Sequence, residues 1–193
     1  MTNDKNYSYW FWKKFFNRDE IISINNYIDL NFDGYEDRSN GATDAFGNYK
    51  KNTIVKLISL EKMFRFQSIK NLFNSIHYSN KNNFGYDLYP DLNFNNFLYN
   101  VYDSKTLGKY DYHSDVSKNN ILSIKLTLII NLSTEQYSGG EFYLFDNEEK
   151  KMNEISEPGD AMIFSSYLSH KVTPVTSGVR KSLAYFFEGP RFK

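Results

Sequence analysis

The chain has 193 residues, a formal net charge of +0 and an aromatic content of 18%. The balanced charge leaves no basic excess to drive phosphate binding, so nucleic acid is not an expected partner. The absence of cysteine excludes disulfides, thiol catalysis and thiolate metal ligands, so any metal must be bound by His, Asp, Glu or water.

The N-terminal stretch MTNDKNYSYWFWKKFF has an early acidic residue and only a short apolar run. This pattern fits neither a signal peptide nor a membrane span, and no later stretch reaches about 18 consecutive apolar residues. We therefore expect a soluble, cytoplasmic protein without a membrane partner.

The first half of the chain is predicted to contain an opening strand and a helix. Residues 6–15 alternate as a strand does. Residues 17–32 have a helical pattern, in which Asn17 is the expected N-cap. Three isoleucines recur at helical spacing within it: Ile21, Ile24 and Ile28.

The segment Gly34–Asn52 holds three glycines and no apolar period, which predicts a long, partly mobile loop that could serve as a lid. A strand over residues 53–60 and a helix over residues 61–80 follow. His77, near the end of that helix, has no carboxylate at ligand spacing and is interpreted as structural. Residues 85–103 predict two short aromatic strands that are broken at Pro90.

From Phe97 onward, short strand-like segments are separated by turn residues, and no helical period occurs among them. Such spacing is typical of an all-β sandwich or barrel. The chain is therefore expected to be an α+β protein forming a single domain over residues 1–193, with its helices in the first half.

Two histidines and one aspartate form the candidate metal site. His113 and Asp115 are spaced i and i+2, so on one strand they would project from the same face. His170, at the end of a later strand, could supply a third ligand. Two imidazoles and one carboxylate are the facial triad of non-haem Fe(II) oxygenases, which leaves open positions for a chelating co-substrate and dioxygen.

Arg180 and Ser182 offer a second feature, because they share a face if both lie on one strand. A guanidinium binds a carboxylate through two parallel hydrogen bonds and keeps its charge when it is buried. Taken alone, His170 would be an ordinary turn histidine and Arg180 a surface ion-pair residue. Their order and strand context in the same chain favour a metal site with a clamp for the far carboxylate of a keto diacid.

At these residues the sequence resembles the Fe(II)/2-oxoglutarate-dependent dioxygenases of the prolyl 4-hydroxylase type, and among them the bacterial and viral PKHD-type hydroxylases. The resemblance runs from about residue 97 to residue 190. It is carried by three segments: GKYDYHSDV, YSGGEFYLFD and EPGDAMIFSSYLSHKVTPVTSGVRKSLAYFF.

The resemblance implies a double-stranded β-helix, a jelly-roll or cupin-like barrel over residues 96–193 that is supported by a helix-containing region over residues 1–95. It implies Fe(II) bound by the predicted triad, with 2-oxoglutarate and O2 as co-substrates and ascorbate as a reductant. Arg180 would pair with the distal carboxylate of 2-oxoglutarate beside Ser182. Tyr102 would reach the co-substrate, and Tyr110 would line the pocket.

The reaction implied is hydroxylation of an unactivated C–H in a peptide, protein or small-molecule acceptor, with a prolyl residue as the family's association. One alternative is a non-catalytic cupin-like binding or structural module with a vestigial metal site. Another is a zinc hydrolase with the same ligands, although no general base accompanies them and Arg180 would have no role.

Overall fold

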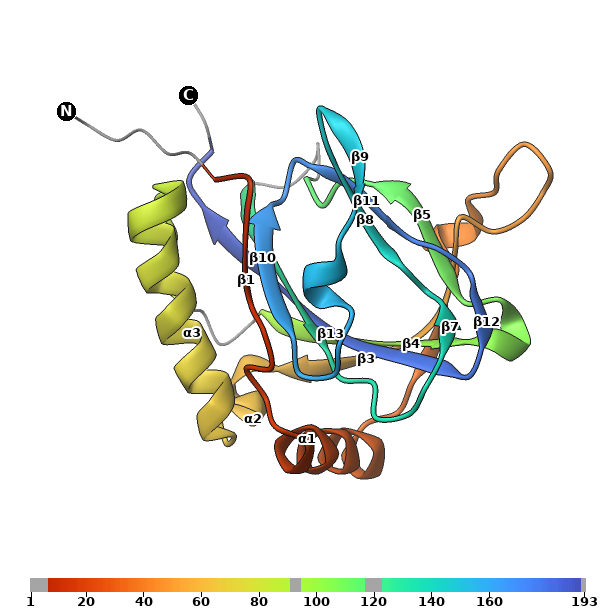
Figure 1. Cartoon of the computed structure of the whole chain (residues 1–193), viewed down its shortest axis with the longest axis horizontal. Coiled ribbons are helices and arrows are strands. Elements are labelled where there is room, and N and C mark those ends of the chain that lie inside the picture. The colour runs from red at the N-terminus through yellow and green to blue at the C-terminus, as the bar shows by residue number, and fades with distance from the viewer. Residues whose placement is uncertain (1–6, 91–94, 117–122, 192–193) are drawn as a thin grey trace.

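The computed structural model describes residues 7–90, 95–116 and 123–191. Its strands form one 11-stranded antiparallel sheet that folds over on itself (Figure 1). The larger layer has the order β1-β10-β6-β13-β4-β3, with β2 added at β3. These strands are β1 (Tyr9–Trp12), β2 (Tyr35–Asp37), β3 (Lys51–Ser59), β4 (Asn96–Asp103), β6 (Ser123–Asn131), β10 (Ala161–Ser165) and β13 (Val179–Gly189).

The smaller layer continues from the first residues of β3 in the order β5-β11-β8-β9. Its strands are β5 (Lys109–His113), β8 (Phe142–Asp146), β9 (Glu148–Lys151) and β11 (Ser169–Val172). A separate two-stranded ladder joins β7 (Ser138–Gly139) to β12 (Val175–Ser177). The predicted double-stranded β-helix is confirmed, because two facing antiparallel layers enclose an interior.

Helices cover the outer face of the larger layer (Figure 1). They are α1 (Arg18–Asn31), α2 (Leu60–Met63) and α3 (Gln67–Ser79), and the short helical turns are η1 (Ser39–Gly41), η2 (Asn80–Phe84), η3 (Ser104–Thr106) and η4 (Asn153–Ile155). The prediction for α1 is confirmed, including its N-cap. The Asn17 side chain accepts from the N–H of Glu20, whose carboxylate accepts in return from the N–H of Asn17.

Two apolar cores follow from the alternation of side chains along the strands. On β13, Leu183, Tyr185 and Phe187 face the helices and join the larger core, which also contains Phe73 of α3. Arg180 and Ser182 lie on the opposite face of the same strand, toward the interior between the layers. The second core lies in that interior and includes Tyr102, Phe142 and Phe164. The strand period therefore separates a structural face from a face that is available for chemistry.

The predicted loop over Gly34–Asn52 contains more structure than the sequence indicated, so that prediction was wrong in part. β2 pairs with β3, η1 follows, and β3 already begins at Lys51. Within the loop, Asp44 Oδ1 accepts hydrogen bonds from the N–H groups of Phe46 and Asn48. Such side-chain-to-backbone bonds close turns in polar segments that lack an apolar period. Its role as a lid stays a prediction.

Three other expected elements are corrected. The helix over residues 61–80 is interrupted between α2 and α3, where Phe66 adopts an extended backbone. Among the strand-like segments expected after Phe97, residues 170–175 (HKVTPV) are divided between two strands, because Pro174 has no N–H to continue the ladder. Residues 85–90 form no strand, and their backbone is held by Asn80, whose side chain bonds both the N–H and the C=O of Tyr86. Residues 91–94, where the broken segment continues, lie outside the described residues.

No helix in the described ranges is long and apolar enough to cross a membrane.

Phe73 provides a test of the larger core, since its ring contacts those of Phe97, Tyr185 and Phe187. We expect Phe73→Ala to lower the free energy of unfolding by about 3–5 kcal/mol, because truncating a buried aromatic leaves a cavity. Urea unfolding measures the loss. The control is Tyr78→Ala on the same helix, where the side chain is 73% exposed and the change should stay within about 0.5 kcal/mol. Equal losses in the two variants would contradict this account of the core.

Candidate metal and co-substrate site

Backbone pairing brings the two candidate histidines together. His113 is the last residue of β5, and His170 on β11 is its direct partner in the antiparallel register. Directly paired residues project from the same face of a sheet, and here that face is the interior. Their ring centroids lie 4.1 Å apart. The ring of Phe164 packs against the His170 imidazole from the larger layer, at 4.8 Å.

Asp115 reaches the same point by a route that the strand argument did not predict. It lies two residues beyond the end of β5, so it does not belong to that strand. Its N–H donates to the carbonyl of Ser166 over 3.1 Å, and Thr127 Oγ1 donates to its Oδ2 over 2.6 Å. Contacts with β6 and with the turn after β10 therefore orient the carboxylate, in place of a strand alternation.

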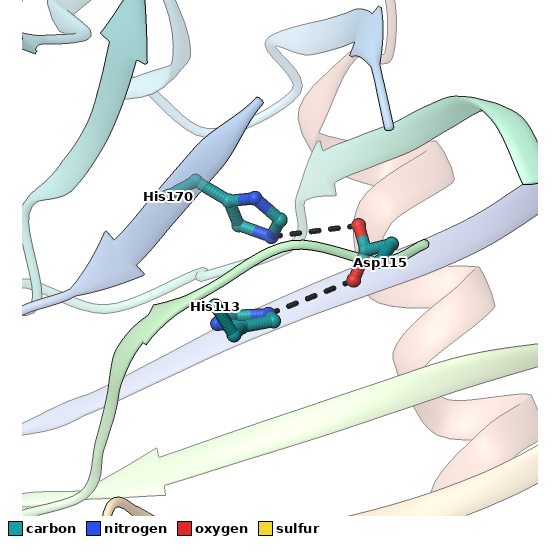
Figure 2. A group of neighbouring side chains, drawn as sticks. All are labelled: His113, Asp115 and His170. Atoms are coloured by element: carbon teal, nitrogen blue, oxygen red, sulfur yellow. Dashed lines mark ion pairs between the residues drawn. The ribbon is translucent and has the colours of Figure 1, made fainter. Parts of the chain in front are cut away.

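The three side chains point toward one another (Figure 2). His113 Nε2 lies 3.6 Å from Asp115 Oδ1, and His170 Nε2 lies 3.5 Å from Asp115 Oδ2. One donor atom from each residue falls within 4.8 Å of the others. The exposed fractions of the side chains are 19% for His113, 9% for Asp115 and 5% for His170, so the cluster is shielded from solvent.

Hydrogen bonds fix which nitrogen of each imidazole faces the centre. His113 Nδ1 lies 2.9 Å from the carbonyl of Asp111, and His170 Nδ1 lies 3.0 Å from the carbonyl of Leu168. A carbonyl can only accept, so each Nδ1 carries a proton and Nε2 is the ring nitrogen that faces the centre. This is the outer hydrogen bond that metal-ligating histidines make.

Burial sets the charge states of the cluster. It lowers the pKa of His113 to about 3, with the nearby His170 acting in the same direction, so this imidazole is neutral at physiological pH. Burial also raises the pKa of Asp115, against the opposing effects of His170 and Thr127. A divalent cation between these residues would stabilise the ionised carboxylate. Two imidazoles and one carboxylate fit Fe(II) in the facial arrangement.

Arg180 lies in the same interior, on β13, and is 2% exposed. Its Nη1 donates to Ser182 Oγ over 3.3 Å, and its Cζ lies 5.2 Å from the centre of the Tyr102 ring. Within the described ranges, no carboxylate forms a salt bridge with it at 4.0 Å or less. A buried guanidinium without an acidic partner is costly unless an anion binds it.

A cavity of about 50 Å³ connects these groups. Its lining contains every site residue that the sequence predicted: Tyr102, Tyr110, His113, Asp115, His170, Arg180 and Ser182. The structure thus brings together residues from β4, β5, β11 and β13. Their roles as ligands stay predictions. His77 lies apart from this group on α3, where its ring packs against Phe187.

The two predicted tyrosines differ in their contacts. Tyr110 stacks on the His113 imidazole, with ring centroids 3.4 Å apart and an angle of 13° between the ring planes. Burial raises the pKa of Tyr110 to about 12 and also raises the pKa of Tyr102. Both phenols therefore keep their proton at neutral pH.

Sequence reasoning missed Thr127 and Lys51. Thr127 is a buried hydroxyl within the apolar strand SIKLTLIIN, and that isolated polar residue was the available signal. Lys51 gave no signal, since in the sequence it lies in a polar run before the strand predicted over residues 53–60. Its Nζ bonds Asp37 Oδ2 over 2.7 Å and lies 4.5 Å from the centre of the Tyr110 ring, so it supports the wall that packs on His113.

Comparison with known proteins adds a family and a set of similar folds. Residues 97–188 match the model described as the 2OG-Fe(II) oxygenase superfamily. A comparison with curated protein sequences gives no match.

Three similar solved structures are prolyl hydroxylases. The Pseudomonas putida prolyl-4-hydroxylase aligns with a TM-score of 0.68 at 13% identity, covering 95% of this chain and 94% of its own. The viral collagen prolyl hydroxylase of Paramecium Bursaria Chlorella virus-1, in its 2OG complex, gives 0.67 at 14%, covering 95% and 97%. The Trichoplax adhaerens prolyl hydroxylase, in complex with a hypoxia inducible factor oxygen degradation domain peptide fragment, gives 0.66 at 16%, covering 96% and 84%. At these identities the likeness is one of fold.

The Thr127–Asp115 hydrogen bond can be tested by metal binding. We expect Thr127→Val to weaken Fe(II) affinity about 10–100-fold, the usual effect of removing a group that orients a metal ligand. Anaerobic Fe(II) titration measures it. The control is Thr176→Val, at an exposed position of β12, which should bind Fe(II) as the unmodified protein does. Equal affinity in both variants would show that Thr127 does not orient Asp115.

The lowered pKa of His113 predicts an acid-sensitive stability in the metal-free protein. Unfolded histidine titrates near pH ~6.5, whereas folded His113 titrates near pH 3. Between these values the unfolded state binds the extra proton, so stability falls as the pH is lowered.

With a chelator present to keep both proteins metal-free, His113→Gln should therefore lose less stability between pH 7 and pH 5 than the unmodified protein does, as measured by urea unfolding. The raised pKa of Asp115 acts in the opposite direction, but it is present in both proteins and so leaves the comparison intact. The control Thr176→Val removes no titratable group and should keep the original pH dependence. Identical slopes for His113→Gln and the unmodified protein would contradict the assignment.

Proposed function

Because residues 97–188 match the 2OG-Fe(II) oxygenase superfamily, we propose that this chain hydroxylates an unactivated C–H of a prolyl residue or of another peptide- or amino-acid-like acceptor. One C–H group, one O2 and one 2-oxoglutarate would give one alcohol, one succinate and one CO2. The observation that carries the proposal is a single buried cavity that holds three converging ligand groups and an arginine without an acidic partner.

His113, Asp115 and His170 would hold the iron through their inward-facing Nε2 and carboxylate oxygens. Bound Fe(II) would supply the activation of O2 and the oxidative decarboxylation of 2-oxoglutarate. The protein's part is to fix geometry. The carbonyls of Asp111 and Leu168 hold the imidazole tautomers, and Thr127 holds the carboxylate.

Arg180 would bind the distal carboxylate of 2-oxoglutarate, because a planar guanidinium matches a carboxylate with two parallel donors. Ser182 holds one edge of the guanidinium, and the Tyr102 phenol adds a donor nearby. With the iron at one end of the cavity and Arg180 at the other, the keto diacid would be held at both ends. Burial excludes water, which strengthens both interactions.

The acceptor would approach past the apolar part of the cavity lining, which includes Leu98, Ala184 and Phe186. An apolar wall suits an alkyl ring or side chain better than a charged one. The prolyl hydroxylase folds among the similar structures support a peptide acceptor, since one of them was solved with a peptide fragment. A vestigial binding module would need neither the inward-facing Nε2 atoms nor the buried arginine.

Iron binding and turnover test the proposed ligands. Anaerobic Fe(II) with 2-oxoglutarate should give the unmodified protein a weak visible charge-transfer band, and admission of air should give succinate. His170→Ala should lose the band and the succinate, because one ligand is removed. His77→Gln serves as a control with a histidine changed outside the cavity. Full succinate formation by iron-loaded His170→Ala would refute the ligand assignment.

The clamp is tested separately. Arg180→Ala should raise the 2-oxoglutarate concentration needed for half-maximal succinate formation by about 100-fold, the scale of losing a charge-assisted pair of hydrogen bonds. Iron affinity should hardly change. Arg18→Ala, on the exposed first turn of α1, controls for loss of a charge. An unchanged 2-oxoglutarate requirement in Arg180→Ala would remove Arg180 from the co-substrate site.

A further inference from the structure

Gly140 lies directly behind the Arg180 side chain. Its φ is +63°, and a Cβ built on it would lie 3.0 Å from Arg180 Cδ and 2.9 Å from Val175 Cγ2. Contacts this short are closer than ordinary van der Waals contact, so a side chain here would have to displace a neighbour. The Arg180 side chain therefore occupies space that a side chain at position 140 would need.

Backbone hydrogen bonds hold Gly140 in place. Gly139 pairs with Val175 across the β7–β12 ladder, and the N–H of Gly140 donates to the carbonyl of Pro174 over 3.1 Å. A Cβ on Gly139 would lie 2.1 Å from that same carbonyl oxygen, so the two segments are in close backbone contact. The Gly139–Gly140 backbone, which forms a wall beside Arg180, therefore cannot shift without breaking the hydrogen bonds that join β7 to β12.

Arg180 separates two cavities. On one side it lines the metal cavity with Tyr102 and Ser182, and on the other it lines a larger cavity of about 640 Å³ with Gly140. Gly140 lines the larger cavity and is absent from the lining of the metal cavity. Bulk added at position 140 would therefore displace the arginine arm from outside the metal cavity.

We propose that Gly140 is a positioning residue that sets the distance between Arg180 and the metal ligands, and so selects a five-carbon keto diacid. The inference rests on the proposed function, in which Arg180 binds the distal carboxylate. A fixed wall beside the Arg180 arm holds the guanidinium at the position that one length of diacid fits. A side chain at position 140 displaces the arm and so changes which length fits.

Binding of keto diacids to the Mn(II)-loaded protein tests this without turnover. Calorimetry compares freshly dissolved oxaloacetate, 2-oxoglutarate and 2-oxoadipate, which differ by one methylene each. One methylene in a fitted site changes affinity about 10–200-fold. The unmodified protein should bind 2-oxoglutarate at least about tenfold more tightly than either neighbour. In Gly140→Ala the preference for 2-oxoglutarate over at least one of its two neighbours should fall about tenfold, because the guanidinium is displaced, while Mn(II) affinity is unchanged.

Two variants separate the contact with Arg180 from other effects. Gly47→Ala has the same positive φ problem, at +82°, but its Cβ would have no neighbour within 4 Å, so it should keep the original preference. The double variant Gly140→Ala/Val175→Ala removes the contact with Val175 and keeps the one with Arg180. It should show the changed preference even where Gly140→Ala alone folds poorly.

The outcomes are distinct. If the unmodified protein binds none of the three diacids, the proposed function fails. If it binds 2-oxoglutarate but binds 2-oxoadipate equally well, the fixed wall is refuted whatever the variants do. If it is selective and the folded position-140 variants keep its preference, the role of Gly140 is refuted and the proposed function stands.

Discussion

The pairing of β5 with β11 is the constraint on which the site depends. Because His113 and His170 are direct partners in that register, a shift of one residue would turn one imidazole to the outside of the barrel. The register is supported from both sides: β11 pairs with β8 over four residues, and β5 pairs with the start of β3. Tyr110 then fills the space beside His113, and Lys51 packs on Tyr110 from β3. An ordinary antiparallel pairing of two strands therefore places the two imidazoles side by side.

The cavity concentrates groups that are unfavourable in the empty protein. Burial raises the pKa of Asp115, lowers that of His113, and leaves the Arg180 guanidinium hydrogen-bonded to the hydroxyl of Ser182. A cation between the histidines and the aspartate would stabilise the ionised carboxylate, and an anion would pair with the arginine. The site thus favours a metal and a diacid together, because a buried charge without a partner is destabilising. The fold tolerates this arrangement because the helix-covered core on the other face of the larger layer is apolar and closely packed.

Local sequence patterns identified the chemistry better than the architecture around it. The H-x-D spacing, the later histidine and the arginine ten residues beyond it are short-range features, and all of them line one cavity. The reason first given for Asp115 was incomplete, since its position depends on Ser166 and Thr127, which are distant in sequence. Thr127, Lys51 and Gly140 were missed for the same physical reason: their importance arises from strand partners that no local period specifies. The strand and turns within residues 35–50 were missed because polar turns are closed by side-chain hydrogen bonds, which leave no hydrophobic pattern in the sequence.

The two ends of the cavity belong to different layers of the barrel. The histidines are carried by the smaller layer, whereas Arg180 and Ser182 are carried by β13 of the larger one. The length of the site therefore depends on how the layers are held apart, and β3, which pairs with both β4 and β5, joins them. The β7–β12 ladder adds a second fixed point next to the arginine. A rod-shaped diacid that bridges the layers would report their separation through its affinity, so under this proposal co-substrate selectivity would depend on the barrel's construction as well as on the residues that contact the ligand.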